Sequence, residues 1–194
     1  MPQEILQTKE GLFYVERELI PESDISTRLD EVAAEIDKTY QGKNLLIVGV
    51  LKGAFVVTSE LTKRITLKDT EIDFMRAKSY NGTNSNGRPA ISYWPDIPVT
   101  GRHLLLVEDI IDTGYTLNQV VGEVNQENPA SLRVLALLDK PSRRQTDIEA
   151  EVTVGFTIPD VWVEGFGLDT DERNRNGANI RYRELVNSSS IVAF

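Results

Sequence analysis

Two adjacent carboxylates, Glu108 and Asp109, follow a run of four apolar residues in the segment LLLVEDIIDTGYTL. Ionised carboxylates only accept hydrogen bonds, and their oxygens are ligands that hard cations such as Mg²⁺ prefer. The apolar run predicts a buried strand, and open α/β sheets bind ligands at the ends of their strands. The pair therefore suits the hydroxyl groups of a ligand or a hard cation.

A short loop, Asp112–Thr116, comes next, and apolar residues then recur at helical spacing. The free N–H groups at a helix start and the positive end of its dipole together form an anion site. Gly114 lets an anion approach the backbone, and Thr113 and Thr116 add hydroxyl donors. The loop therefore suits a phosphate, although the same residue types also occur in turns that only cap a helix.

Apolar runs of strand length alternate with helical patterns along the chain. We expect strands at 45–51, 71–75, 91–94, 104–107, 132–138 and 152–156, short strands near 12–15 and 191–194, and helices at 22–40, from 54 to about 64 and from about 115. This alternation predicts an α/β fold with a mostly parallel, twisted sheet flanked by helices. We expect a single domain over 1–194, with a core at about 22–150. A small hood subdomain from the N-terminal segment and about 151–194 should cover the strand ends.

The composition excludes several classes of protein. The 194 residues carry a formal net charge of −9, which argues against general nucleic-acid binding. The chain has no Cys and one His, so disulfides, thiolate metal sites and His-rich zinc sites are excluded. No apolar run approaches the ~20 residues of a membrane span, and the first residues lack a signal pattern. We therefore expect a cytoplasmic enzyme with no membrane partner.

Further loops carry residues that have both a chemical and an ordinary interpretation. Lys52 and Gly53 follow the strand 45–51, where a plain loop lysine is the simpler alternative. Lys140 follows the strand 132–138 in the sequence DKPSRR, which also fits a solvated basic cluster. The polar segment 78–89 could be an ordinary hairpin tip or a lid over a site.

The segment VEDIIDTGYTL resembles the phosphoribosyl pyrophosphate (PRPP) signature of type I phosphoribosyltransferases, and is closest to the hypoxanthine-guanine branch. The resemblance covers roughly residues 5–176 and ends at the divergent segment 176–183. It implies the type I fold and a Mg²⁺-dependent purine salvage reaction. In that reaction hypoxanthine or guanine joins PRPP, and the products are IMP or GMP and pyrophosphate. Members of the family usually form homodimers or homotetramers.

The resemblance also implies roles for the residues of the central motif and its neighbours. The residues expected to bind the ribose and phosphate of PRPP are Glu108, Asp109, Asp112, Thr113, Gly114, Tyr115 and Thr116. Asp112 is expected to be the catalytic acid/base, through nitrogen 7 of the purine. Lys52, Gly53 and Arg175 are expected to bind pyrophosphate, often with a cis peptide before the lysine.

For the purine, the resemblance implies a lysine, Lys140, that donates to the oxygen on carbon 6, and a stacking ring, Trp162. The backbone of Val163 and the neighbourhood of Asp169 would read the edge of the base. Ser79 and Tyr80 match a flexible lid that closes over the site.

The magnesium ion would lie near Asp169, with Glu108 and Asp109 as further candidate ligands. Two alternatives stay open. One is a transferase that prefers another base, such as xanthine; Lys140 disfavours adenine, because an ammonium group only donates hydrogen bonds. The other is a PRPP-fold regulatory protein that binds RNA, against which the acidic total charge and Asp112 count.

Overall fold

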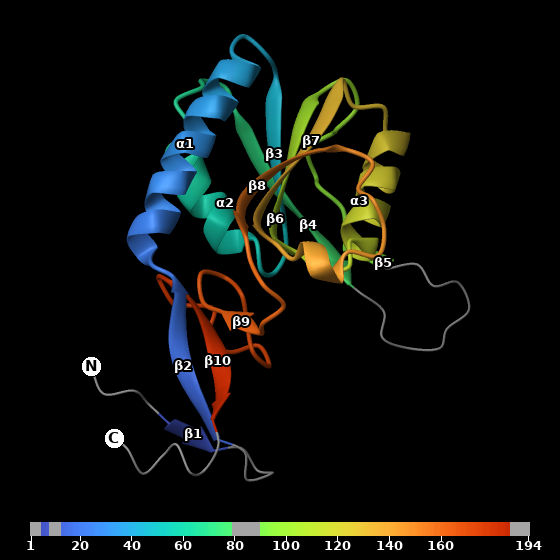
Figure 1. Ribbon diagram of the computed structural model, residues 1–194. Helices are drawn as coiled ribbons and strands as arrows, with labels where there is room; N and C mark the ends of the chain where they lie inside the picture. Colours follow the sequence, from blue (N-terminus) through green and yellow to red (C-terminus); the bar gives the residue numbers. More distant parts are fainter. Residues whose placement is uncertain (1–4, 8–12, 79–89, 187–194) are drawn as a thin grey trace.

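The computed structural model describes residues 5–7, 13–78 and 90–186 (Figure 1). A six-stranded sheet in the order β5-β4-β3-β6-β7-β8 forms the centre of the molecule, and all neighbours in it are parallel except β5 beside β4. Its strands are β3 (Leu45–Val50), β4 (Glu71–Lys78), β5 (Ala90–Tyr93), β6 (His103–Ile111), β7 (Ser131–Asp139) and β8 (Glu151–Thr157). The predicted α/β class with a mostly parallel sheet is confirmed.

Three helices cover the two faces of this sheet (Figure 1): α1 (Glu22–Tyr40), α2 (Phe55–Thr62) and α3 (Tyr115–Gln126). Successive residues of a strand point to opposite faces, so each apolar run supplies two cores. Ile47 and Leu105 pack on the side of α1 and α2, whereas Leu46 and Leu106 pack on the side of α3. Among the helices that the structure describes, none has the length and apolar character needed to cross a membrane.

A second, antiparallel sheet forms the hood beside the carboxyl end of β3, where the chain reverses into α2 (Figure 1). Its order is β1-β2-β10-β9, with β1 (Ile5–Gln7), β2 (Phe13–Ile20), β9 (Val163–Glu164) and β10 (Ile180–Val186). β8 belongs to the larger sheet, so the described hood strands come from the chain before Pro21 and after Trp162.

Neither β9 nor β10 was among the expected strands, and the strand expected near 191–194 lies outside the described residues. The extents of the single domain, about 22–150 for the core and about 151–194 for the hood, stay predictions.

Candidate functional site

A cavity of about 270 Å³ lies where the loops after β3 and β6 meet the hood. It collects most of the residues that the sequence singled out, although they come from three distant parts of the chain. Those that line it are Lys52, Gly53, Glu108, Asp109, Asp112, Thr113, Gly114, Thr116, Asp169 and Arg175. The carboxyl ends of neighbouring parallel strands share one edge of the sheet, and this edge is where a ligand crevice is expected.

The acid pair lies in the second half of β6, which continues through it to Ile111. Burial raises the pKa of Glu108 well above its usual value, and the adjacent Asp109 charge raises it further. Burial also raises the pKa of Asp109, to about 6, although hydrogen bonds from the backbone, including the N–H of Ile110 at 2.8 Å, oppose the shift. Oε2 of Glu108 is buried without a hydrogen-bond partner in the described part of the chain. This Glu108 oxygen therefore lacks a partner, which a ligand hydroxyl or a cation would supply.

Position 53, beside this pair, has no space for a side chain, so it requires glycine. A Cβ atom at Gly53 would overlap the carboxylate of Asp109, so any other residue would push that carboxylate away. The peptide bond between Leu51 and Lys52 is cis, as the resemblance implied for this turn. The loop after β3 thus brings its backbone directly against the acid pair.

The predicted phosphate loop precedes α3 and ends at the helix start. Gly114 is the N-cap, with φ of +90°, a left-handed conformation that glycine adopts without steric cost. The segment after β7 supports the loop, because the N–H of Gln145 donates to the carbonyl of Thr113 at 2.9 Å. The N–H groups of the first turn of α3 have no acceptors within the helix, so the loop can bind an anion.

Two cations face the cavity, and both already have carboxylate partners. Arg175 contacts Oδ1 of Asp169 at 2.8 Å and Oε2 of Glu172 at 2.9 Å. Nζ of Lys52 contacts the same Glu172 oxygen at 3.0 Å. Sequence reasoning missed Glu172, because a single acidic residue three positions before an arginine gives no sign of a second partner 120 residues away.

Asp112 is connected to the predicted base-binding residues through residues that the sequence analysis did not select. Nε of Arg143 donates to Oδ1 of Asp112 at 3.0 Å. Arg143 also lies 3.8 Å from Asp160, and Asp160 lies 3.9 Å from Nζ of Lys140. Lys140 is 7% exposed, so it is not part of a solvated basic cluster. The sequence DKPSRR showed a group of basic residues at a strand end, but their charge alone did not indicate which of them is buried.

Four further predicted residues that the structure describes do not line the cavity, namely Lys140, Trp162, Val163 and Tyr115. Trp162 is 62% exposed, Val163 is buried in β9, and Tyr115 is exposed at the start of α3. Trp162 and Val163 follow Asp160 in the sequence by two and three residues, and Asp160 lies 3.9 Å from Nζ of Lys140. Ser79 and Tyr80, the predicted lid residues, lie outside the described part of the chain.

The carboxylates at the cavity fit a hard cation only in part. Within residues 5–7, 13–78 and 90–186, no three acidic or His side chains gather closely enough to hold a metal alone. Asp169 is near enough to Asp109 to raise its pKa, so two carboxylates do approach each other. Mg²⁺ commonly binds through one or two carboxylates together with substrate phosphates. The donor set fits an ion that a phosphorylated ligand completes.

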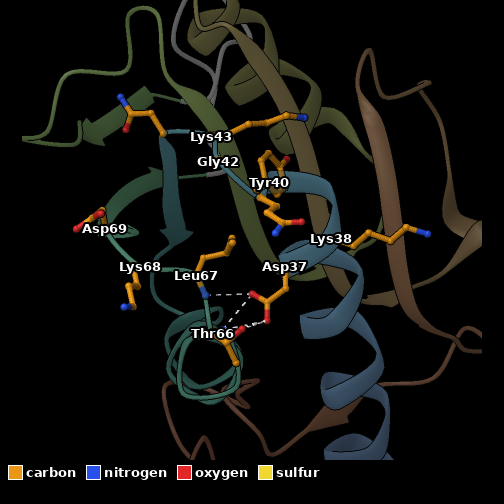
Figure 2. Close-up of a pocket in the computed structure, with 11 residues that line it drawn as sticks. Asp37, Lys38, Tyr40, Gly42, Lys43, Thr66, Leu67, Lys68 and Asp69 are labelled. Atoms are coloured by element: carbon orange, nitrogen blue, oxygen red, sulfur yellow. Dashed lines mark hydrogen bonds between the residues drawn. The ribbon is translucent and has the colours of Figure 1, made fainter.

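A larger cavity, about 820 Å³, lies at the opposite, amino ends of β3 and β4. Asp37, one of its two acids, accepts hydrogen bonds from the backbone N–H groups of Thr66 and Leu67 at 3.0 to 3.3 Å, as Figure 2 shows by dashed lines. Lys38 and Lys68 point away from each other on either side of Asp37 (Figure 2). Because its charged groups do not converge, this cavity is a weaker candidate than the one at the carboxyl ends.

Comparison with known proteins agrees with this geometry. Residues 21–171 match the family model described as the phosphoribosyl transferase domain. A hypoxanthine phosphoribosyltransferase of Haemophilus influenzae is 45% identical over 81% of this chain and 89% of its own length. A hypoxanthine-guanine phosphoribosyltransferase of Bacillus subtilis is 44% identical over 84% of this chain and 89% of its own.

The chain spans only about 25% of the bifunctional TilS/HprT protein of Listeria monocytogenes, which it matches at 42% identity. Among solved structures, a hypoxanthine phosphoribosyltransferase of Staphylococcus aureus has a TM-score of 0.81 at 40% identity, covering 87% of this chain and 91% of that one. The chain therefore belongs to the phosphoribosyltransferase family, and to its hypoxanthine-guanine branch.

Proposed function

We propose that this protein is a purine salvage enzyme that joins hypoxanthine or guanine to PRPP, giving IMP or GMP and pyrophosphate. The observation that carries the proposal is one cavity in which an acid pair and a phosphate loop face two cations. The names of the relatives supply the two bases, because those relatives are called hypoxanthine and hypoxanthine-guanine phosphoribosyltransferases.

The acid pair and the loop hold the sugar phosphate. Glu108 and Asp109 accept hydrogen bonds from the ribose hydroxyls, and their negative charge favours the positive charge that develops on the sugar ring. The 5′-phosphate binds the backbone of the Asp112–Thr116 loop, with Thr113 and Thr116 as further donors. Holding the reactants in place can itself contribute ~7–11 kcal/mol to the lowering of the barrier.

The other side of the cavity receives the leaving pyrophosphate. Arg175 and Lys52 supply positive charge, and the backbone of Gly53 lies close enough to contact a phosphate oxygen. Asp169 and Asp109, the two carboxylates that approach each other, would hold Mg²⁺, with Glu108 as a further candidate ligand, and the bound ion would neutralise charge on the pyrophosphate. Glu172 forms ion pairs with both cations and would be displaced from them by the pyrophosphate group.

The base binds on the side of Lys140 and Trp162. The ammonium group of Lys140 donates to the oxygen on carbon 6, which selects a 6-oxopurine. Trp162 stacks on the ring, Val163 reads its edge through the backbone, and Asp112 exchanges a proton at nitrogen 7 as nitrogen 9 attacks the sugar. The hydrogen bond from Arg143 keeps the Asp112 carboxylate oriented.

A panel of free bases, incubated with PRPP and Mg²⁺, tests the proposal. Hypoxanthine and guanine should give IMP and GMP with release of pyrophosphate, and adenine should give no product. Preferred use of xanthine would instead identify the xanthine-specific alternative, and the absence of product with every base would contradict the function. A homodimeric or homotetrameric assembly in the cytoplasm stays a prediction that sedimentation and cell fractionation can check.

A further inference from the structure

A chain of hydrogen bonds links the exposed ring of Trp162 to a buried carboxylate in the hood. Nε1 of Trp162 donates to Oγ1 of Thr170 at 2.8 Å. Oγ1 of Thr170 in turn donates to Oε2 of Glu164 at 2.7 Å. Trp162 is 62% exposed whereas Glu164 is 1% exposed, so this chain joins the surface of the base subsite to the interior of the hood.

Chemistry fixes the direction of both hydrogen bonds. An indole N–H can only donate, and an ionised carboxylate can only accept. The single hydroxyl hydrogen of Thr170 must therefore point to Glu164, which leaves its lone pairs to face Trp162. Glu164 thus determines that Thr170 is an acceptor toward the tryptophan ring.

The charge on Glu164 is held by groups from three segments. Its Oε2 also accepts from Nδ2 of Asn174 at 3.0 Å and lies 3.2 Å from Nη2 of Arg183. Burial by itself raises the pKa of Glu164, but the hydrogen bonds from Asn174 and Thr170 and the charge of Arg183 bring it below its usual value. Glu164 is therefore ionised at neutral pH.

The divergent segment 176–183 and the strand that it begins supply the cations for this arrangement. Arg181 is the register partner of Glu164 in the β9–β10 pair, and Arg183 lies two residues on, on the same face of the strand. Arg181 also contacts Glu16 of β2 at 2.9 Å, so the carboxylate of Glu164 is fixed by the whole hood sheet.

We infer that Thr170 and Glu164 are positioning residues that hold the Trp162 ring in the plane in which it stacks on the purine. This inference rests on the proposed function. An exposed tryptophan with a free indole N–H would turn about its side-chain bonds, and the base would have to order it on binding. Because its N–H is already engaged, Trp162 offers the base only the face of its ring.

Thr170→Val tests the inference, because valine keeps the shape of threonine and removes the hydroxyl. The KM for hypoxanthine and guanine should rise roughly two- to tenfold, the range expected for one lost hydrogen bond. The KM for PRPP should change less than twofold. Thr170→Ser, which restores a hydroxyl, should restore the KM for the base.

Fluorescence gives a second readout that does not depend on turnover. The chain has two tryptophans, so Trp94→Phe leaves Trp162 as the only indole emitter. In that background, Thr170→Val should lower the anisotropy of Trp162 in the ligand-free protein, and Thr170→Ser should not. Arg17→Gln is the matched control, since Arg17 and Glu184 pair across the same two strands, β2 and β10, without any link to Trp162. It should leave both readouts unchanged.

Glu164→Gln extends the test to the buried end of this series of hydrogen bonds. A glutamine amide can donate as well as accept, so it no longer forces the Thr170 hydroxyl away from Trp162. The KM for the base should rise as in Thr170→Val, provided that circular dichroism shows a folded protein; if it does not, the Thr170 variants decide.

Specific outcomes would overturn the inference. Unchanged base KM and unchanged anisotropy in Thr170→Val, with normal wild-type turnover, would overturn it alone. An equal rise in the KM for the base and for PRPP would show a general structural role and also overturn it. A wild-type protein that uses no base at all would overturn the proposed function, and with it the purpose assigned to these bonds.

Discussion

At the scale of the residue, Asp112 has the clearest chemical role. Its carboxylate is paired with Arg143 at 3.0 Å and faces the same cavity as the phosphate loop. Asp112→Asn keeps the shape of the side chain but removes the group that exchanges the proton. We expect kcat to fall roughly 10²- to 10⁴-fold while PRPP binding survives, because acid/base catalysis is usually of that size.

Steady-state kinetics and PRPP titration by calorimetry would measure both quantities for Asp112→Asn. Asp160→Asn is the control for the loss of a carboxylate charge beside Arg143, because Asp160 lies 3.8 Å from the same guanidinium group. Turnover of Asp112→Asn close to that of the wild type would remove Asp112 from the acid/base role.

Lys140 is a buried cation with only a distant partner, Asp160 at 3.9 Å. A hydrogen bond from a charged group is typically worth ~1.5–3 kcal/mol, so Lys140→Ala should lower kcat/KM for hypoxanthine and guanine about ten- to hundredfold. PRPP binding should change much less. Lys43→Ala, at the cavity on the opposite end of the sheet, is a control with no expected effect. Equal losses for base and PRPP would mean that Lys140 only supports the structure.

The sequence predicted a site residue where the residues next to it in the chain form a recognisable pattern. Asp109 and Thr113 are recognisable because a buried strand, a loop and a helix start are contiguous in the chain. Glu172 and Arg143 were missed because their partners, Lys52 and Asp112, are brought to them only by the fold. No local pattern marks such a pairing, so these ion pairs are visible only in the structure.

At the scale of the element, the loop after β3 depends on one glycine. In Gly53→Ala the new Cβ would overlap the carboxylate of Asp109, so the acid pair must move. We expect at least a roughly hundredfold loss of kcat/KM, since small displacements of positioning groups have effects of that size. Circular dichroism should show a folded protein.

Gly122→Ala is the matched control for this prediction. Gly122 lies within α3, and a Cβ there would meet nothing within 4 Å. Alanine in a helix is favoured over glycine by ~0.5–1 kcal/mol, so this variant should be slightly more stable and fully active. Similar kinetics for the two variants would contradict the argument that space beside Asp109 selects Gly53.

The elements themselves differed in how well the sequence predicted them. The helix expected over 22–40 is observed as Glu22–Tyr40, because its apolar residues recur at one spacing throughout. The sequence did not predict β10, because the charged residues within it, Arg181, Arg183 and Glu184, are typical of a solvent-exposed loop. Two of those charges are satisfied by Glu16 and Glu164, which lie on the strands beside β10. A strand that depends on such distant ion pairs has no local signature.

At the scale of the whole molecule, the fold concentrates negative charge at the point where the sheet meets the hood. The chain has a net charge of −9, and Glu108, Asp109 and Asp169 all face one cavity. Only Arg175 and Lys52 oppose them directly among the described residues that line this cavity, and Glu172 already contacts both. A site arranged to receive a cation and a sugar therefore keeps buried carboxylates whose charged form is disfavoured, chiefly by burial and to a smaller extent by repulsion, and this cost lowers the stability of the protein.

This trade-off predicts how the stability of the ligand-free protein depends on pH. Burial raises the pKa of Asp109 from 3.8 to about 6, so the folded state binds its proton more tightly than the unfolded chain does. The contribution of Asp109 to stability is therefore most favourable below about pH 4 and falls as the pH rises to about 6. Asp109→Asn removes this loss. With a chelator present and no substrate, the variant should be about 1–3 kcal/mol more stable than the wild type at pH 7.5.

Urea unfolding followed across pH 4 to 8 would measure the difference, which should shrink toward zero at the acidic end. Asp147→Asn, at an exposed position, serves as the control and should stay within ~0.5 kcal/mol of the wild type at every pH. The same Asp109→Asn variant should lose most of its transferase activity, because the amide no longer provides the negative charge beside the sugar. If the variant were less stable than the wild type at pH 7.5, the carboxylate would be a structural anchor, and its burial would not be a cost that the ligands relieve.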